Sequence, residues 1–299
     1  MLTDNRTERM PQRVAVIGGG AVGCYIASQS YAAGHEVILC LRTSFDRLIV
    51  DSSNISEEVP VTITTEPDRQ TIADWVLITT KAQDTLSTMP WLAHLVGSHT
   101  VVVLLQNGIN HQERLHQVVP KESILPGLVY VAVERIAPGH IVHRGGSRIL
   151  VPDTEHGESF RRLLLGSNTQ VLLESDFRTA AWKKLLSNLA ANPITALTLQ
   201  RIGILQHPEV EALARGLLQE GVAVGRAAGA ILGPDDIDQT LALYAQFEPN
   251  SGTSMLYDRL AGRPLEHEYI GGAVVRAGEK YGVPTPLNRV LLTLLRELT

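Results

Sequence analysis

Short apolar runs alternate with amphipathic stretches along the first half of the chain. The apolar runs are rich in β-branched residues and occupy residues 13–17, 36–41, 61–65, 75–80 and 101–105. Residues 21–33, between the first two runs, have apolar positions at helical spacing. Strands that are apolar at nearly every position, with helices between them, are typical of a parallel sheet buried on both faces.

Two longer segments that resemble strands follow, at residues 124–133 and 140–151, with Pro138-Gly139 between them. A Pro-Gly pair favours a tight turn, so these segments are expected to form two strands that extend the sheet with antiparallel pairing. Residues 155–165 have a helical pattern, and residues 171–174 form one last apolar run.

The pattern changes after residue 176, because strand signals end there and only helical periodicity follows. The helices are expected at residues 177–199, 208–228, 235–247, 265–281 and 286–298. A chain of 299 residues is long enough for two domains. We therefore expect an α/β domain at residues 13–176 and an all-α C-terminal domain at residues 177–299.

Composition narrows the class of protein. Hydrophobic residues make up 44% and charged residues 19%, which is typical of a well-packed globular chain. The net charge of -5 and the scattered cations argue against a nucleic-acid partner. No apolar run reaches the roughly 18 residues that a membrane span needs. Residues 1–12 are polar, lack the apolar stretch of a signal peptide, and are expected to be a disordered tail.

The only cysteines are Cys24 and Cys40, and both lie in apolar segments. This usage excludes a disulfide framework and a cysteine metal site, and it fits small core residues of a cytoplasmic protein. His140 and His143 are three apart on an expected strand, where side chains alternate between faces, so we expect no shared metal ion.

The first strand runs directly into a glycine-rich turn that opens a helix. Its six residues satisfy the pattern G-x-G-x-x-G, and they are Gly18, Gly19, Gly20, Ala21, Val22 and Gly23. In this context Gly18 permits the tight turn, Gly20 lets the backbone approach a pyrophosphate, and Gly23 lets helix and strand pack closely. The helix N-terminus offers free N–H groups to phosphates. The motif predicts a Rossmann-type doubly wound sheet that binds a dinucleotide; the alternative is a plain turn.

The end of the second strand favours NADPH over NADH as the cofactor. NAD-binding folds place an acid there on the ribose 2′-hydroxyl, whereas this strand ends in Arg42-Thr43-Ser44. Arg42 is suited to pair with a 2′-phosphate. The alternative is an ordinary solvated cation, which leaves the missing acid unexplained.

Polar residues follow two further strands of the expected sheet. Lys81 comes after residues 75–80, and Asn107 follows residues 101–105. Ligands of open α/β sheets bind beyond these carboxyl ends, so both side chains are candidates for contact with cofactor or substrate. Each is equally compatible with an ordinary loop position.

The helix after residue 176 contains Lys184, Asn188 and Asn192 at spacings of four, which places them on one face. Asparagine is a poor mid-helix residue, and Pro193 is expected to kink or break the helix near Leu189. Transfer of a hydride to a ketone builds negative charge on the carbonyl oxygen, and a desolvated lysine is suited to stabilise that charge and to supply the proton. The alternative for Lys184 is a solvated surface lysine.

The segment from Trp182 to Ala196 resembles the W-x-K-L-x-x-N-x-x-x-N-P-x-T-A motif of the ketopantoate reductase family. The segment from Ser254 to Glu266 is similar to that family's S-M-L-x-D…G-R-P-x-E motif. Gln106-Asn107-Gly108, Lys81-Ala82 and the closing Tyr281-Gly282-Val283-Pro284 match its other motifs, in the same order along the chain.

The resemblance implies NADPH-dependent reduction of 2-dehydropantoate (ketopantoate), a 2-oxo acid, to (R)-pantoate on the way to pantothenate and coenzyme A. It implies that Lys184 is the general acid and that Glu266 orients substrate or Lys184 and touches the nicotinamide. It further implies that Asn188 and Asn192 bind the hydroxyl end of the substrate, and Ser254 its carboxylate. Asn107 would contact both ligands, and Lys81 the cofactor. The sequence leaves the oligomeric state open, and a homodimer through the helical domain is one candidate.

Several residues near the expected substrate site depart from the family pattern, namely Leu265, His267, Glu268 and Gly271. They leave open a different small 2-oxo acid as substrate. Ser254 and Glu266 each have an alternative as helix-capping residues. For His267 a solvated helix position is favoured over a place in the substrate pocket. An NADPH-binding redox sensor without turnover is the alternative from a different class of protein.

Overall fold

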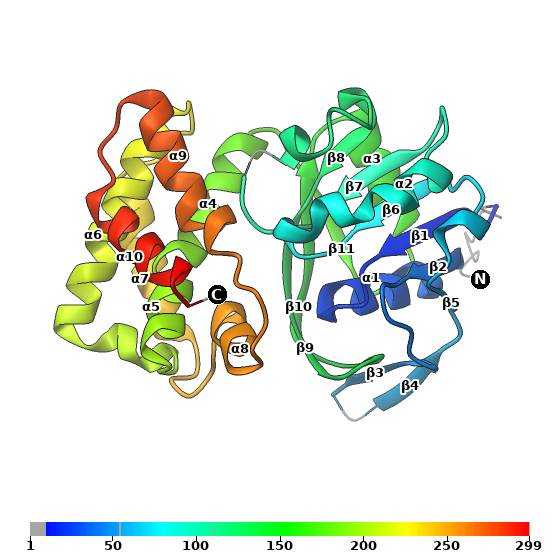
Figure 1. The fold of residues 1–299 in the computed structure, drawn as a ribbon, viewed down its shortest axis with the longest axis horizontal. Helices are drawn as coiled ribbons and strands as arrows, with labels where there is room; N and C mark the ends of the chain where they lie inside the picture. Colours follow the sequence, from blue (N-terminus) through cyan, green and yellow to red (C-terminus); the bar gives the residue numbers. More distant parts are fainter. Residues whose placement is uncertain (1–9, 54, 110, 299) are drawn as a thin grey trace, which may run out of the picture. The chain divides into compact units, whose positions relative to one another are not determined.

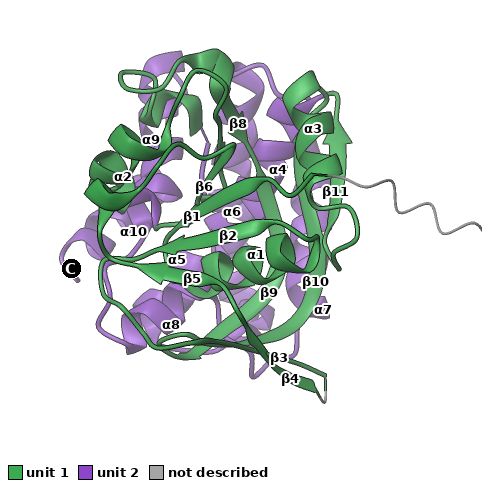
Figure 2. Ribbon diagram, turned by 90° about the vertical axis from the view of Figure 1, so that its right-hand side faces the viewer, with its two compact units in different colours: residues 1–80, 84–106, 111–175 green, residues 81–83, 107–110, 176–299 purple. Residues whose placement is uncertain are grey.

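The computed structural model describes residues 10–53, 55–109 and 111–298. The chain forms two compact units (Figure 2). Unit 1 comprises residues 1–80, Asp84–Gln106 and His111–Ser175, and unit 2 comprises Lys81–Gln83, Asn107–Asn110 and Asp176–Thr299. Of the expected tail, residues 1–9 lie outside the described residues.

Unit 1 contains a six-stranded sheet in which every pairing is parallel (Figure 1). Its strands are β1 (Arg13–Ile17), β2 (Glu36–Cys40), β5 (Thr62–Thr64), β6 (Trp75–Ile78), β7 (Val101–Leu104) and β8 (Ile124–Pro126). They lie in the order β5-β2-β1-β6-β7-β8. Numbered among themselves, the strands run 3-2-1-4-5-6, which is the order of a Rossmann fold. The predicted fold class is confirmed.

Helices and a second sheet cover both faces of this sheet, which explains its almost continuous apolar strands. Val14 and Val16 point into a core with α1 (Ala21–Ala32) and α3 (Glu155–Leu163). Ala15 and Ile17, on the opposite face of β1, belong to a second core that includes α2 (Met89–Leu95). Short 3-10 helices complete the connections, at Pro67–Arg69, Ala82–Thr88, His111–Arg114 and Lys121–Ser123.

A second sheet of unit 1 corrects the sequence prediction. It contains β3 (Leu48–Ser52), β4 (Ile55–Val59), β9 (Leu128–Ala137), β10 (His140–Pro152) and β11 (Gln170–Glu174). The antiparallel β9–β10 pair was expected, but it does not extend the first sheet.

The single strand expected at residues 124–133 is two strands in different sheets, separated by Gly127. The N–H of Gly127 donates to the carbonyl of Leu104 over 2.8 Å, and a Cβ at this position would lie 2.6 Å from the Leu105 side chain. The chain leaves the first sheet at this crowded glycine. The β3–β4 hairpin was not predicted, because most of β4 is exposed and polar.

The described part of unit 2 from Asp176 onward is helical and contains no strand. Its helices are α4 (Phe177–Leu189), α5 (Ala191–Thr198), α6 (Pro208–Ala227), α7 (Pro234–Gln246), α8 (Ser254–Leu260), α9 (Gly271–Tyr281) and α10 (Pro286–Arg296). Two 3-10 helices lie between them, at Ile202–Gln206 (η5) and His267–Tyr269 (η6). None of the described helices combines the length and apolar composition that crossing a bilayer requires.

The helix expected at residues 177–199 is broken where Pro193 predicts it. Helix α4 ends at Leu189, and Ala190 caps both α4 and α5. Asp176 starts α4 by accepting a hydrogen bond from the Thr179 N–H over 3.1 Å. The segment expected as one helix at residues 265–281 is instead η6 followed by α9, and α8 was not predicted as a helix.

Candidate active site

The glycine-rich turn joins β1 to α1 in unit 1 and is shaped by two of its glycines. Gly18 has a φ of 119°, which L side chains rarely adopt, and its N–H donates to the Cys40 carbonyl over 3.0 Å. A Cβ on Gly23 would lie 1.8 Å from the Gly18 carbonyl oxygen. Gly23 is therefore required for the close packing of the helix against the turn.

Gly20 differs, because a Cβ there would meet nothing within 4 Å. Gly20 is the N-cap of α1, no side chain caps this helix end, and its first turn has no acidic residue. The backbone amides of Ala21 and Val22 open the helix at the positive end of its dipole. Open space beside bare backbone at a helix N-terminus fits the pyrophosphate of a dinucleotide.

Arg42 lies exposed two residues beyond the end of β2. Within the described part of the chain, no hydrogen bond or ion pair engages its guanidinium, whereas the nearby Arg47 is bound to Glu58 over 3.4 Å. Arg42 is thus available to an anionic ligand at the strand end where the 2′-phosphate was predicted.

In unit 2, three donors converge on the buried carboxylate of Glu266. Lys81 Nζ lies 3.1 Å from Oε2, Asn107 Nδ2 donates to the same oxygen over 3.0 Å, and the Ala82 N–H donates to Oε1 over 3.2 Å. Glu266 is only 4% exposed. The structure therefore brings together three residues predicted from separate motifs, and the Glu266 carboxylate serves these donors rather than capping a helix.

A second buried carboxylate, that of Asp258, holds the same lysine. Lys81 Nζ lies 2.6 Å from Asp258 Oδ2, and Arg263 Nε donates to Oδ1 over 2.9 Å. Asp258 and Arg263 belong to a family motif, but no role was predicted for them. The spacing of four residues between Ser254 and Asp258, about one helical turn, could have indicated that Asp258 lies near the site.

Lys81 is held as a cation by these neighbours. Burial alone would lower its pKa, but the charges and hydrogen bonds of Glu266 and Asp258 outweigh burial and raise the pKa above its ordinary value. A lysine with a raised pKa is a poor proton donor near neutrality.

Lys184 on α4 has the opposite character. Burial lowers its pKa from the ordinary 10.5 to about 8, because desolvation penalises the charged form. Its side chain is partly buried, whereas the alternative interpretation requires a fully solvated lysine. Of the two lysines, Lys184 has the pKa that suits general acid catalysis near neutral pH.

The asparagines flank the break between α4 and α5. Asn188 is partly exposed on α4, whereas Asn192 lies on α5 and is 3% exposed. The three residues predicted to share one helix are thus divided between two. The Asn192 Nδ2 is buried without a hydrogen-bond partner among the described residues. An unsatisfied buried donor is costly, so it favours a role in binding a ligand.

Ser254 is the exposed first residue of α8. It is not the helix N-cap: Thr253 is, since its hydroxyl accepts from the Leu256 N–H over 3.2 Å. The Ser254 hydroxyl is therefore not used in capping.

The chain matches the family model described as ketopantoate reductase PanE/ApbA over residues 14–156, and the model of that family's C-terminal region over residues 176–299. This chain belongs to the ketopantoate reductase family. It is 38% identical to the 2-dehydropantoate 2-reductase of Caulobacter vibrioides, over 94% of this chain and 97% of that protein.

Solved structures of ketopantoate reductases are similar over the same extent. That of the PanE/ApbA family ketopantoate reductase from Ralstonia eutropha JMP134 is 33% identical, has a TM-score of 0.88, and covers 96% of this chain and 98% of its own. A dimeric ketopantoate reductase from Staphylococcus aureus is 28% identical with a TM-score of 0.87, again over 96% and 98% of the two chains.

Of the residues that depart from the ketopantoate reductase pattern, Leu265, His267 and Gly271 are buried and Glu268 is partly exposed. His267 is 7% exposed, and burial lowers its pKa, so the interpretation as a solvated residue is wrong. Glu268 accepts from Arg276 over 2.8 Å and from Arg296 over 2.6 Å. Leu265 is buried, and a Cβ on Gly271 would meet nothing within 4 Å.

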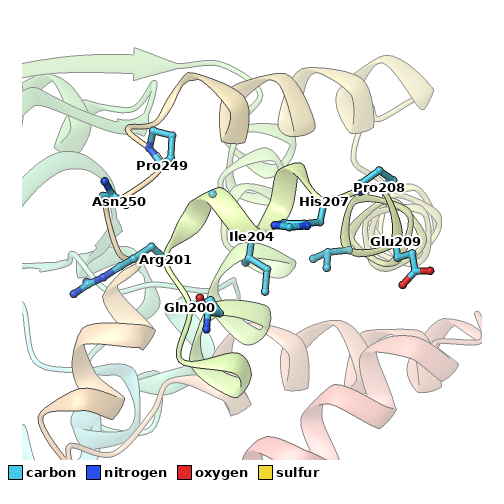
Figure 3. Close-up of a pocket in the computed structure, with 10 residues that line it drawn as sticks. Gln200, Arg201, Ile204, His207, Pro208, Glu209, Pro249 and Asn250 are labelled. Atoms are coloured by element: carbon cyan, nitrogen blue, oxygen red, sulfur yellow. The ribbon is translucent and has the colours of Figure 1, made fainter.

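The predicted residues do not line the open groove of about 880 Å³ in unit 2 (Figure 3). That groove lies between the η5 region and the loop after α7, with Arg201, His207 and Asn250 among its lining residues. Its lining side chains are mostly exposed.

Among the described residues, no cluster of His, Cys, Asp and Glu is arranged to hold a metal ion. Cys24 and Cys40 are buried free thiols.

Proposed function

We propose that this member of the ketopantoate reductase family reduces 2-dehydropantoate to (R)-pantoate with NADPH, and that Lys184 is the general acid. The observation that carries the proposal is the pair of lysines in unit 2. Lys81 is held as a cation by two carboxylates, whereas burial gives Lys184 a pKa of about 8.

NADPH, when bound, supplies the hydride. The chain's own part is to bind it: the amides at the start of α1 hold the pyrophosphate beside Gly20, and the Arg42 guanidinium pairs with the 2′-phosphate. The open space at Gly20 and the unengaged guanidinium of Arg42 support this assignment. Lys81 and Asn107 contact the nicotinamide-ribose end of the cofactor.

Lys184 acts on the ketone oxygen. As negative charge develops there, the ammonium stabilises it and donates a proton from Nζ, which leaves a neutral amine and a new hydroxyl group. A partly desolvated ammonium stabilises this charge more than a hydrated one, because solvent screening is weaker. At neutral pH a lysine of pKa about 8 is still mostly protonated, yet it gives up the proton more readily than an ordinary lysine.

Asn188, Asn192 and Ser254 bind the substrate. The buried, unpartnered Nδ2 of Asn192 is suited to donate to the substrate hydroxyl group, and Asn188 contributes to the same end of the substrate. The exposed hydroxyl of Ser254 binds the carboxylate. Glu266, fixed by its three donors, orients the groups around the reacting centre.

Turnover tests the proposal against both alternatives. The purified protein is mixed with NADPH and ketopantoate, and cofactor absorbance is followed against a panel of other small 2-oxo acids. Saturable oxidation with the highest kcat/KM on ketopantoate is expected. A higher kcat/KM on another 2-oxo acid would reassign the substrate, whereas tight NADPH binding without turnover on the whole panel would support the redox sensor.

We further propose a cytoplasmic homodimer that assembles through unit 2. The Staphylococcus aureus relative is dimeric. Helix α10 exposes an apolar row at helical spacing, with Leu287 37%, Val290 57% and Leu294 50% exposed.

Analytical ultracentrifugation tests the dimer. The wild-type protein should sediment as a dimer, and Val290→Glu should shift the equilibrium toward the monomer. Ile231→Glu, at an exposed apolar residue outside this row, is the control. A wild-type monomer would contradict the proposal.

A further inference from the structure

A pair of buried threonine hydroxyls joins α5 to the start of α8. Thr195 Oγ1 and Thr253 Oγ1 lie 2.7 Å apart, and the two residues are 0% and 9% exposed. They are 58 residues apart in sequence. This hydroxyl contact was not predicted, and neither threonine has a role in the proposed reaction.

The direction of the contact follows from counting protons. The Thr195 hydroxyl lies 2.7 Å from the Ala191 carbonyl, which can only accept, so Thr195 donates there. The proton shared by the two threonines must then come from Thr253. Thr253 Oγ1 in turn accepts from the Leu256 N–H over 3.2 Å. A directed chain of hydrogen bonds therefore runs from the first turn of α8 into the first turn of α5.

The two ends of this chain adjoin two residues proposed to bind substrate. Ala191 directly precedes Asn192, and Thr253 directly precedes Ser254. Asn192 and Ser254, which are proposed to bind substrate, are therefore each bonded directly to a residue that takes part in this chain of hydrogen bonds. Buried hydrogen bonds with defined directions restrict the distance between two helices more strongly than apolar contacts do.

We propose that Thr195 is a positioning residue that sets the spacing between Asn192 and Ser254, and hence the spacing between the hydroxyl and carboxylate groups of the substrate that fits. This inference rests on the proposed function. A substrate held at both ends needs its partners within about 0.5 Å of the productive geometry. Loss of the hydroxyl link weakens substrate binding, while the affinity for NADPH stays unchanged.

Thr195→Val tests this inference, because valine keeps the shape of threonine and removes the hydroxyl group. We expect KM for ketopantoate to rise about tenfold, the effect of one hydrogen bond of ordinary strength, with a smaller change in kcat and an unchanged KM for NADPH. Thr195→Ser restores the hydroxyl and should restore KM. A valine variant with normal KM for ketopantoate would overturn the inference.

Thr240→Val is the matched control. Thr240 is a buried threonine of α7 whose hydroxyl donates to the Asp236 carbonyl four residues earlier, over 2.7 Å. This variant loses only the hydrogen bond within its own helix, so it should lower the melting temperature less than Thr195→Val does and leave KM unchanged. An equal rise of KM in both variants would show a general packing effect and overturn the inference.

A double variant separates positioning from an independent contribution. If Thr195 acts through Ser254, then adding Thr195→Val to Ser254→Ala should raise KM less than it does in the wild type. Fully additive effects would contradict the inference. If the wild-type protein prefers another 2-oxo acid, KM of the same variants is compared with that acid as substrate. The role of Thr195 is then still tested, although the assignment of ketopantoate as substrate has failed. No turnover on any 2-oxo acid overturns both.

Discussion

Lys81 and Lys184 belong to the same compact unit, yet their surroundings shift their pKa values in opposite directions. The carboxylates of Asp258 and Glu266, at 2.6 and 3.1 Å, raise the pKa of Lys81 despite its burial. Burial lowers that of Lys184 to about 8. The neighbours of each lysine therefore set the direction of its pKa shift, and the two opposite directions support the proposed roles of Lys81 as a fixed cation and Lys184 as a proton donor.

Lys184→Ala should lower kcat by a factor on the order of 10² to 10⁴, the usual contribution of a positioned general acid. The adjacent Lys183→Ala is the control, since Lys183 is half-exposed and bound to Asp236 over 2.9 Å. Steady-state kinetics on ketopantoate measure both variants. Near-normal kcat in Lys184→Ala would remove Lys184 from the chemistry.

The pH profile of the wild type should report the Lys184 pKa. The acid must be protonated to act, so kcat/KM is expected to be highest below pH 8 and to fall as pH rises through about 8. The measurement is kcat/KM in the reductive direction across neutral and alkaline pH. A fall that begins only near 10.5, the ordinary lysine value, would contradict the role of burial.

Arg42→Ala should weaken NADPH binding by about ten- to a hundredfold, the strength of a hydrogen bond to a charged group, and leave NADH binding almost unchanged. Arg47→Ala, in the same loop but paired with Glu58, is the matched control and should affect neither. Titration calorimetry with both cofactors measures the difference. An equal loss for NADPH and NADH would rule out contact with the 2′-phosphate.

Alanine at two glycines of the turn should have different effects. A Cβ at Gly20 meets no atom within 4 Å, so Gly20→Ala should keep the stability of the fold. NADPH should bind at least about tenfold more weakly, since the Cβ would occupy the space proposed for the pyrophosphate. Gly23→Ala should destabilise the fold by about 1–3 kcal/mol, because its Cβ lies 1.8 Å from the Gly18 carbonyl. Thermal melts and cofactor titrations separate the two. Unchanged affinity in Gly20→Ala would exclude pyrophosphate there.

Asp176→Ala should cost about 1 kcal/mol of stability at neutral pH, because Asp176 caps the helix that contains Lys184. The hydrogen bonds from Thr179 lower the pKa of Asp176. A lowered folded-state pKa gives stability that is complete above the ordinary value of 3.8 and is lost as pH falls through the folded value.

The difference between wild type and Asp176→Ala in denaturant unfolding should therefore shrink below pH 3.8. The control is Thr154→Ala, which removes the N-cap of α3, a hydroxyl group that does not titrate. The stability lost in this variant should not depend on pH. A constant difference for Asp176→Ala would show that the carboxylate charge is not involved.

Much of the fold and part of the site could be predicted from the sequence, because those features depend on local periodicity or on a motif in one segment. Period-two and helical patterns locate β1, α1 and β2, and Pro193 predicts the end of α4 at Leu189. The second sheet could not be predicted, since β4 is exposed and polar and Gly127 redirects the chain through crowding that only the folded structure creates.

By itself, the sequence determined the dinucleotide turn, the helical second half and the family motifs, because each depends on residues close together in the chain. Only the tertiary structure decided how distant residues act on one another. It brought Lys81, Asn107 and Glu266 together, gave Lys81 and Lys184 different pKa values, and joined Thr195 to Thr253. The physical reason is that burial and charge depend on neighbours in space, and folding brings together residues from segments that are far apart along the chain.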